Sequence, residues 1–281
     1  MSVATSAVPS TAQMPADHPA RLVDLARYPI HDLQSAEART LVQRCHDELV
    51  ATGSCMLPGF LTAEALAAMR QEARELAPLA YNEGAAKGTA YLDAPDKSLP
   101  EDHPRRRMLR TSVGAVAYDL VPQGSPLRRL YEWDGLNDFI ASVVGLPNIY
   151  RYADPLGALN IAAMKCGDEL LWHFDQTDFV TSILLEPSEQ GGEFEYVPFI
   201  RSDDDERYDR VKRLFDGDMS EVIRLDLEPG AFAFFKGRHS IHRVTPIEGD
   251  TTRLIALLGY DTKPGTVSSE GLKQRRYGRI N

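Results

Sequence analysis

Cysteine is scarce in this sequence of 281 residues, and positive charge is outnumbered by negative charge. The three cysteines, Cys45, Cys55 and Cys166, are widely spaced and form no C-x-x-C motif, which excludes a disulfide scaffold and a thiolate metal cluster. A balance of 31 Lys and Arg against 41 Asp and Glu gives a formal net charge of −10, which disfavours nucleic acid or an anionic membrane as the main partner. No uncharged apolar run reaches the roughly 18 residues of a membrane-spanning helix. These absences predict a soluble, cytoplasmic protein whose main partner is neither nucleic acid nor a membrane.

The first part of the chain lacks the features of a signal peptide. Residues 1–20 are rich in Ala, Ser, Thr and Pro, without a basic start or an apolar centre. We expect a disordered tail there and a single domain over 21–281. Within it we expect a helical part over about 21–147, a β-rich core over about 148–262 and a C-terminal segment over 263–281.

The first half of the expected domain has the apolar spacing of helices. Residues recurring every three or four positions predict helices over 36–50, 63–77 and 126–144. The stretch 81–107 is rich in Gly, Pro, Asp and Lys and has no such period, which indicates a long surface loop.

Beyond residue 148 the pattern changes to short β-rich runs separated by turn residues. The runs are 158–165, 170–175, 180–186, 193–199, 221–227, 231–236, 240–245 and 253–260. Seven or eight strands in so short a stretch predict an antiparallel sandwich or barrel. The acidic, then helix-like stretch 201–217 is expected to lie on the surface. The predicted fold is therefore mostly β, with N-terminal helices packed on the β core.

Two possible metal ligands lie close together at residues 173 and 175. In a strand, side chains two residues apart share a face, so His173 and Asp175 would point into the barrel while Phe174 points away. A third ligand could come from His239 or His242, which three residues apart would face opposite sides of one strand. We favour His242, because it lies within the apolar run whereas His239 follows a turn.

Two histidines and one carboxylate on a β barrel are the facial triad of non-haem Fe(II) oxygenases, although Zn²⁺ could occupy the same ligands. Arg253 favours iron. It opens the next apolar strand, where an inward guanidinium needs a partner, and its planar fork suits the distal carboxylate of a dicarboxylate.

Together these residues resemble the Fe(II)/2-oxoglutarate-dependent dioxygenases. The motifs, in chain order, are His173-Phe174-Asp175, Gly191-Gly192-Glu193-Phe194, Pro229-Gly230, His242-Arg243-Val244-Thr245-Pro246 and Arg253. The resemblance implies a double-stranded β-helix (jelly-roll, cupin-like) fold, Fe(II) held by His173, Asp175 and His242, O₂ as a cosubstrate, and 2-oxoglutarate bound through Arg253. Asn160, on a neighbouring strand, could donate to the C1 carboxylate of 2-oxoglutarate, or it could be an edge residue facing water.

The segments 172–179 and 192–198 are similar to the branch that hydroxylates or halogenates free amino acids. Halogenases of that branch carry a small residue in place of the metal carboxylate, which opens a position for chloride. Asp175 is present here, so the resemblance implies hydroxylation of an amino-acid-like molecule, with desaturation or ring closure as alternatives.

Residues for substrate recognition are less clearly marked. Trp172, with aromatic residues of 232–235, could wall the cavity or be plain core. Arg105 and Arg110 could form a lid that meets a carboxylate, or a solvated basic stretch. Gln176 follows the metal ligands and could bind an amine or hydroxyl, or belong to a polar turn.

Two other functions remain open from the sequence. One is a nucleotide or protein hydroxylase of the same superfamily, which the net charge disfavours for nucleotides. The other is a cupin-like protein with a static metal site, which would have no need of Arg253 as a dicarboxylate anchor.

Overall fold

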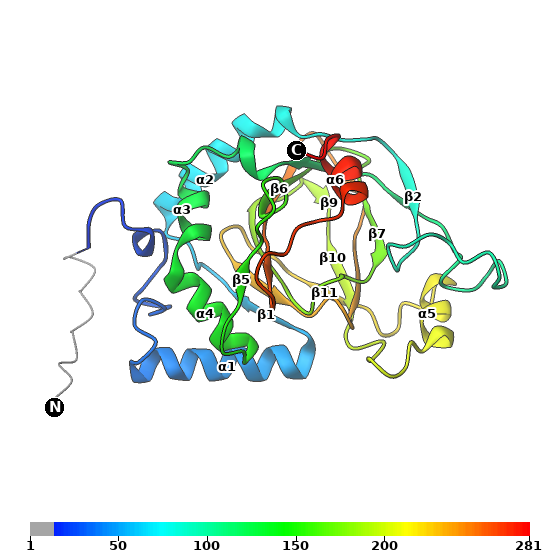
Figure 1. Ribbon diagram of the computed structural model, residues 1–281, viewed down its shortest axis with the longest axis horizontal. Coiled ribbons are helices and arrows are strands. Elements are labelled where there is room, and N and C mark those ends of the chain that lie inside the picture. The colour runs from blue at the N-terminus through cyan, green and yellow to red at the C-terminus, as the bar shows by residue number, and fades with distance from the viewer. Residues whose placement is uncertain (1–13) are drawn as a thin grey trace.

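The computed structural model describes residues 14–281 (Figure 1). Residues 1–13 of the expected tail lie outside the described residues. Residues 14–20 are packed on the domain: the side chain of Met14 is buried, and Arg129 donates a hydrogen bond to the carbonyl of Asp17. The packed chain thus begins before residue 21.

Two antiparallel sheets face each other and form the core. The six-stranded sheet has the order β1 (Ser54–Leu57), β12 (Phe232–Phe235), β8 (Val180–Glu186), β15 (Arg253–Leu258), β6 (Leu159–Met164) and β4 (Gly114–Val116). The four-stranded sheet has the order β11 (Ile223–Leu225), β10 (Phe194–Val197), β13 (Ile241–Val244) and β7 (Leu170–His173). This architecture confirms the predicted mostly β, jelly-roll fold. The expected helical part, however, supplies two strands of the larger sheet, β1 and β4.

Three short ladders complete the strands. They are β14 (Ile247–Glu248) with β9 (Gln190–Gly191), β16 (Tyr260–Asp261) with β5 (Tyr150–Arg151), and β2 (Ala86–Gly88) with β3 (Leu109–Thr111). The last pair closes most of the predicted long loop 81–107 into a hairpin, with β2 inside that stretch and β3 just beyond it.

Four α-helices cover one face of the larger sheet, and two lie elsewhere on the barrel (Figure 1). The helices are α1 (Ala36–Thr52), α2 (Ala63–Leu76), α3 (Pro126–Glu132), α4 (Asp134–Val144), α5 (Tyr208–Phe215) and α6 (Glu270–Tyr277), with 3₁₀ turns η2 (Pro19–Leu22), η3 (Ala77–Leu79) and η4 (Tyr118–Leu120). The starts of α1 and α2 are fixed by Ser35 and Thr62, whose hydroxyls accept from the backbone N–H three residues on. No helix among residues 14–281 is long and apolar enough to cross a membrane.

The predicted helix 126–144 is two helices with a break at Trp133. Trp133 has an extended backbone (φ −74°, ψ 123°) and ends α3 while preceding α4. Its indole lies against Gly135, where a Cβ would meet the ring at 2.4 Å. The absence of a side chain at Gly135 therefore lets the chain turn sharply here, which apolar spacing alone does not reveal.

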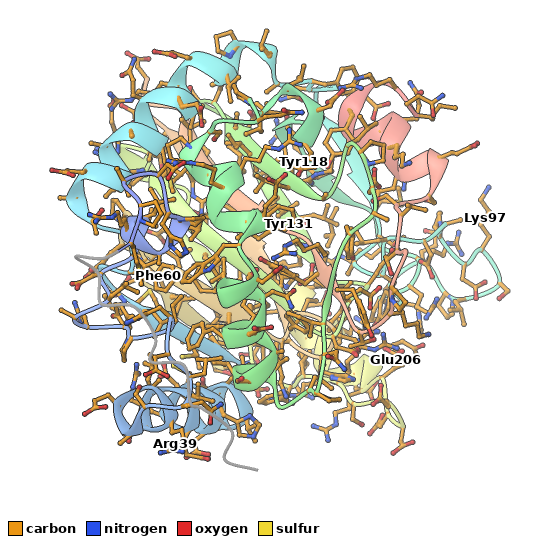
Figure 2. All side chains as sticks on the ribbon, turned by 60° about the vertical axis from the view of Figure 1, so that its left-hand side comes forward. Arg39, Phe60, Lys97, Tyr118, Tyr131 and Glu206 are labelled. Carbon is orange, nitrogen blue, oxygen red and sulfur yellow. The ribbon has the colours of Figure 1, made fainter. Side chains whose placement is uncertain are left out.

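The alternation of side chains divides the larger sheet into two faces. Phe232 and Phe234 of β12, like Leu254 and Ala256 of β15, belong to the main hydrophobic cluster with the helices. Figure 2 shows two other members of that cluster, Phe60 and Tyr131, on the part of the molecule that carries the helices, whereas Lys97 projects from the other side. The alternate residues of each strand face the barrel interior.

The outer face of the smaller sheet is covered by the insertion 201–217. Its helix α5 places Val211 and Leu214 against Trp172 and Ile241 in a second hydrophobic cluster. The expected surface excursion is therefore also the cover of a sheet.

Candidate metal centre

Two histidines lie directly opposite each other in the smaller sheet. His173 of β7 and His242 of β13 are register partners, and their ring centroids are 4.1 Å apart. Nδ1 of His173 lies 2.9 Å from the carbonyl oxygen of Leu171, and Nδ1 of His242 lies 3.1 Å from that of Ser240. Each carbonyl fixes the proton on Nδ1, so both Nε2 atoms present a lone pair to the same space.

The third ligand is positioned by a backbone contact rather than by strand alternation. Strand β7 ends at His173, so Asp175 lies beyond it. The N–H of Asp175 donates to the carbonyl of Gly237 at 3.0 Å, which turns the carboxylate back toward the histidines. A Cβ on Gly237 would lie 1.7 Å from Oδ2 of Asp175, so only glycine fits beside this carboxylate.

The three side chains have the geometry of a metal site. Nε2 of His173 lies 3.6 Å from Oδ1 of Asp175, and Nε2 of His242 lies 3.6 Å from its Oδ2. Three ligand atoms, one from each residue, all lie within 4.8 Å of one another. Adjacent ligand atoms on one ion, each at about 2.1 Å from it, are about 3 Å apart, so closure needs only a small movement.

A buried oxygen at this site lacks a partner. Among the described residues, Oδ2 of Asp175 is buried and accepts no hydrogen bond, which is costly for a carboxylate oxygen. A cation between this oxygen and the two Nε2 atoms would satisfy all three. The residues therefore fit the Fe(II) that the sequence resemblance implies.

The electrostatics keep the ligands in the form that binds a metal. Burial and the neighbouring His173 lower the pKa of His242 to about 4, so its imidazole is neutral at pH 7. Burial opposes the charge of Asp175, but His242, His173 and Arg276 together hold the pKa of its carboxyl below the ordinary value. Metal binding at neutral pH thus displaces no proton from His242 or Asp175.

His239, the rejected alternative ligand, lies outside the group. Its Nε2 is 3.0 Å from Oδ1 of Asp203, and a quarter of its side chain is exposed. The sequence-based choice of His242 over His239 thus agrees with the geometry.

Arg253 points into the barrel without an acidic partner. It is 3% exposed, and among residues 14–281 no carboxylate lies within 4.0 Å of its guanidinium. Burial lowers its pKa to about 10, with no opposing contribution from a nearby acid. A Cβ on Gly192 would lie 2.9 Å from Cδ of Arg253, so this glycine gives the arginine its space.

Asn160 shares the inner face with Arg253. It lies on β6 opposite Leu257 of β15, four residues from Arg253 and on the same side of that strand. Its Oδ1 accepts a hydrogen bond of 3.2 Å from Nη2 of Arg276, a residue that the sequence analysis did not consider. Asn160 is buried and therefore is not the water-facing edge residue of the alternative interpretation.

Of the two interpretations of Trp172, the geometry favours a core residue over a wall of the site. Trp172 lies on the outer face of the smaller sheet, under α5, and the guanidinium of Arg243 stacks on its ring at 4.7 Å. Strand alternation that points His173 inward necessarily points Trp172 outward. Of the aromatic residues 232–235, Phe235 reaches the inner face, where its ring lies 4.7 Å from that of His242.

The predicted substrate arginines are paired with acids, one in the same loop and one just before β7. Arg105 pairs with Asp93 and lies over the ring of Tyr91, and Arg110 pairs with Glu169. Because both arginines are already paired with acids, the structure favours a basic surface stretch and not a lid that binds the carboxylate of a substrate. Gln176 is exposed in the turn after Asp175, where its carbonyl accepts from Arg238, so its side chain stays a candidate.

Comparisons with known proteins place this site in a family. The family model HalD, described as halogenase D, matches residues 36–271. A search of curated protein sequences finds no match.

Solved structures share the fold at low sequence identity. The carbocyclase SnoK from nogalamycin biosynthesis, described as non-haem and α-ketoglutarate dependent, has a TM-score of 0.55 and 17% identity over 83% of this chain and 90% of its own. AviO1 from Streptomyces viridochromogenes Tue57 has a TM-score of 0.54 and 17% identity, with coverages of 81% and 97%. An oxidoreductase of the 2OG-Fe(II) oxygenase family from Burkholderia pseudomallei has a TM-score of 0.52 and 15% identity, with coverages of 84% and 94%.

The family match covers most of the chain, and the neighbours carry the same fold. The chain belongs to the halogenase D family, and it shares its fold with solved Fe(II)/2-oxoglutarate-dependent oxygenases.

Proposed function

We propose that this oxygenase hydroxylates an unactivated C–H bond of a small, polar, amino-acid-like molecule and converts 2-oxoglutarate to succinate and CO₂. The observation that carries the proposal is the pairing of an open His-Asp-His group with a buried guanidinium on one barrel interior. A static metal site would not require Arg253, whose burial without an acid is costly until an anion binds.

Iron bound to His173, Asp175 and His242 would supply the activation of O₂. The protein's own residues do the positioning. The carbonyls of Leu171 and Ser240 orient the two imidazoles, and the guanidinium of Arg253 would bind the distal carboxylate of 2-oxoglutarate. Phe194 and Phe235 pack against His242 with ring distances of 5.4 and 4.7 Å, which excludes water from that side of the site.

Asp175 supports hydroxylation although the matching family is described as a halogenase. Its carboxylate is placed to occupy a metal position together with the two histidines. With Asp175 as well as the two histidines available to hold the metal, the site would not offer a halide the position that a smaller residue at 175 would open.

The test is succinate release across a panel of free amino acids, followed by mass analysis of the product in buffer containing chloride. We expect coupling to at least one amino acid and a product that gains one oxygen atom. No coupling above background would refute the amino-acid substrate. A chlorinated product would refute the role of Asp175, and loss of two hydrogens would assign the chemistry to desaturation or ring closure, the alternative that a carbocyclase among the structural neighbours suggests.

A further inference from the structure

The C-terminal helix α6 is held firmly against the barrel. Tyr277 is buried with Ala115 of β4 and Leu156, and Lys273 pairs with the fully buried carboxylate of Asp154 at 3.6 Å. Figure 1 shows α6 at one end of the barrel, where the helix contacts β4. The helix is polar overall, so these few contacts rather than a broad apolar face determine its position.

Arg276 of this helix points toward the metal site. Its Nη2 donates to Oδ1 of Asn160 at 3.2 Å, and Asn160 lies on the inner face that also carries Arg253. Arg276 is half-buried, in contrast to the fully buried Arg253.

The guanidinium of Arg276 has no acidic partner within the described chain. Among residues 14–281 no carboxylate lies within 4.0 Å of it, whereas Arg279, three residues on, pairs with Asp119. Its one side-chain bond to Asn160 leaves further N–H groups free, because a guanidinium has five. Among residues 14–281, Arg253 and Arg276 are therefore cations of the barrel interior without an acidic partner, the first buried and the second half-buried.

We propose that Arg276 binds the carboxylate of the organic substrate through a charge-assisted hydrogen bond. The inference rests on the proposed function and adds to it the chemical group of the substrate that the protein recognises, a carboxylate. The distal carboxylate of 2-oxoglutarate is already assigned to the buried Arg253. The half-buried Arg276 is then available to the organic substrate, which enters the site from solvent. Because the carbonyl oxygen of the Asn160 amide accepts from Arg276, the amide also holds the guanidinium in place.

The test compares Arg276→Gln and Arg276→Lys with Arg275→Gln, a matched control on the exposed side of the same helix. Calorimetry under anaerobic conditions measures binding of common amino acids and simple carboxylic acids, each paired with its amide, to protein loaded with Fe(II) and 2-oxoglutarate. We expect Arg276→Gln to weaken binding of the preferred acid about 10- to 100-fold, the range for a hydrogen bond to a charged group. Lysine should recover part of the loss. Arg276→Gln should change neither the affinity for the amide nor the half-saturating concentration of 2-oxoglutarate. Arg275→Gln should bind the preferred acid as tightly as the wild type does.

The other outcomes separate this inference from the proposed function. Amino acids that bind wild type and Arg276→Gln alike would overturn the role of Arg276 and leave the substrate class intact. Arg276-dependent binding of carboxylic acids other than amino acids would uphold Arg276 and refute the amino-acid substrate. If no acid binds wild type better than its amide, or if Arg276→Gln raises only the 2-oxoglutarate requirement, Arg276 is not the substrate anchor.

Discussion

A buried guanidinium without an acid beside it destabilises the folded protein, and Arg253 is such a group. Replacing it by methionine, an apolar residue of similar length, should stabilise the metal-free protein by about 1–3 kcal/mol in urea unfolding. The same variant should lose the stabilisation that 2-oxoglutarate gives the wild type. A variant less stable than wild type, or one that 2-oxoglutarate still stabilises, would contradict the assignment of Arg253.

Gly237 is predicted to be important for metal affinity, although it is not itself a ligand, because it leaves room for the carboxylate of Asp175. Alanine there would displace the carboxylate of Asp175, so the Gly237→Ala variant should bind Fe(II) about 10- to 100-fold more weakly in an anaerobic titration. Gly124→Ala is the control, since no atom lies within 4 Å of the added Cβ. Equal affinities of wild type and Gly237→Ala would show that Asp175 is not held in the observed position.

The metal-free protein should lose stability in mild acid through His242. Its pKa is lowered to about 4 by burial and by His173, against an ordinary value near 6.5 in the unfolded chain. The unfolded state therefore binds the proton first as pH falls, so stability is fully present above pH 6.5 and decreases toward pH 4, by up to about 3 kcal/mol. Urea unfolding with a chelator present measures this slope. In the His242→Gln variant, the free energy of unfolding should depend less steeply on pH. A slope equal to that of the wild type would contradict the role of His242.

For single residues, the sequence predicted those positions that follow from the alternation of side chains along a strand. His173, His242 and Arg253 lie inside the barrel as alternation requires. Arg276 was missed because it reaches the site from a short polar helix, through a contact 116 residues away in sequence that no local pattern encodes.

Among the elements, α6 depends on one buried carboxylate. Asp154 accepts from the N–H of Leu156 and of Ser268 and pairs with Lys273. Asp154→Ala should destabilise the protein by about 1–3 kcal/mol and speed hydrogen exchange selectively in residues 266–277. Asp138→Ala, on the exposed side of α4, should change neither. Exchange that speeds up evenly along the chain would contradict a local clamp.

Element existence was largely predictable, and element pairing was not. The predicted helices 36–50 and 63–77 differ from α1 and α2 by no more than two residues at either end, because caps and apolar spacing define them locally. Residues 54–57 and their neighbours carried no signal that they would, as β1, join β12 at the edge of the larger sheet. Such pairing depends on segments distant in sequence.

For the whole molecule, we propose that the described chain unfolds as one domain. One hydrophobic cluster joins the helices to the larger sheet, and another joins the smaller sheet to α5. The two tryptophans report on different layers, since Trp133 lies between α3 and α4 and Trp172 lies in β7. The variants Trp133→Phe and Trp172→Phe each leave one tryptophan as a fluorescence reporter. In each variant, the urea midpoint measured by fluorescence should equal the midpoint measured by circular dichroism. Separate midpoints within either variant would indicate two folding units.

The central claim is that His173, Asp175, His242 and Arg253 form one Fe(II)/2-oxoglutarate centre. The most direct measurement is the visible absorption of the protein after anaerobic addition of Fe(II) and 2-oxoglutarate. We predict a weak charge-transfer band in the wild type that disappears in the double variant Asp175→Ala, His242→Ala. Absence of the band in the wild type, or its survival in the double variant, would contradict the claim.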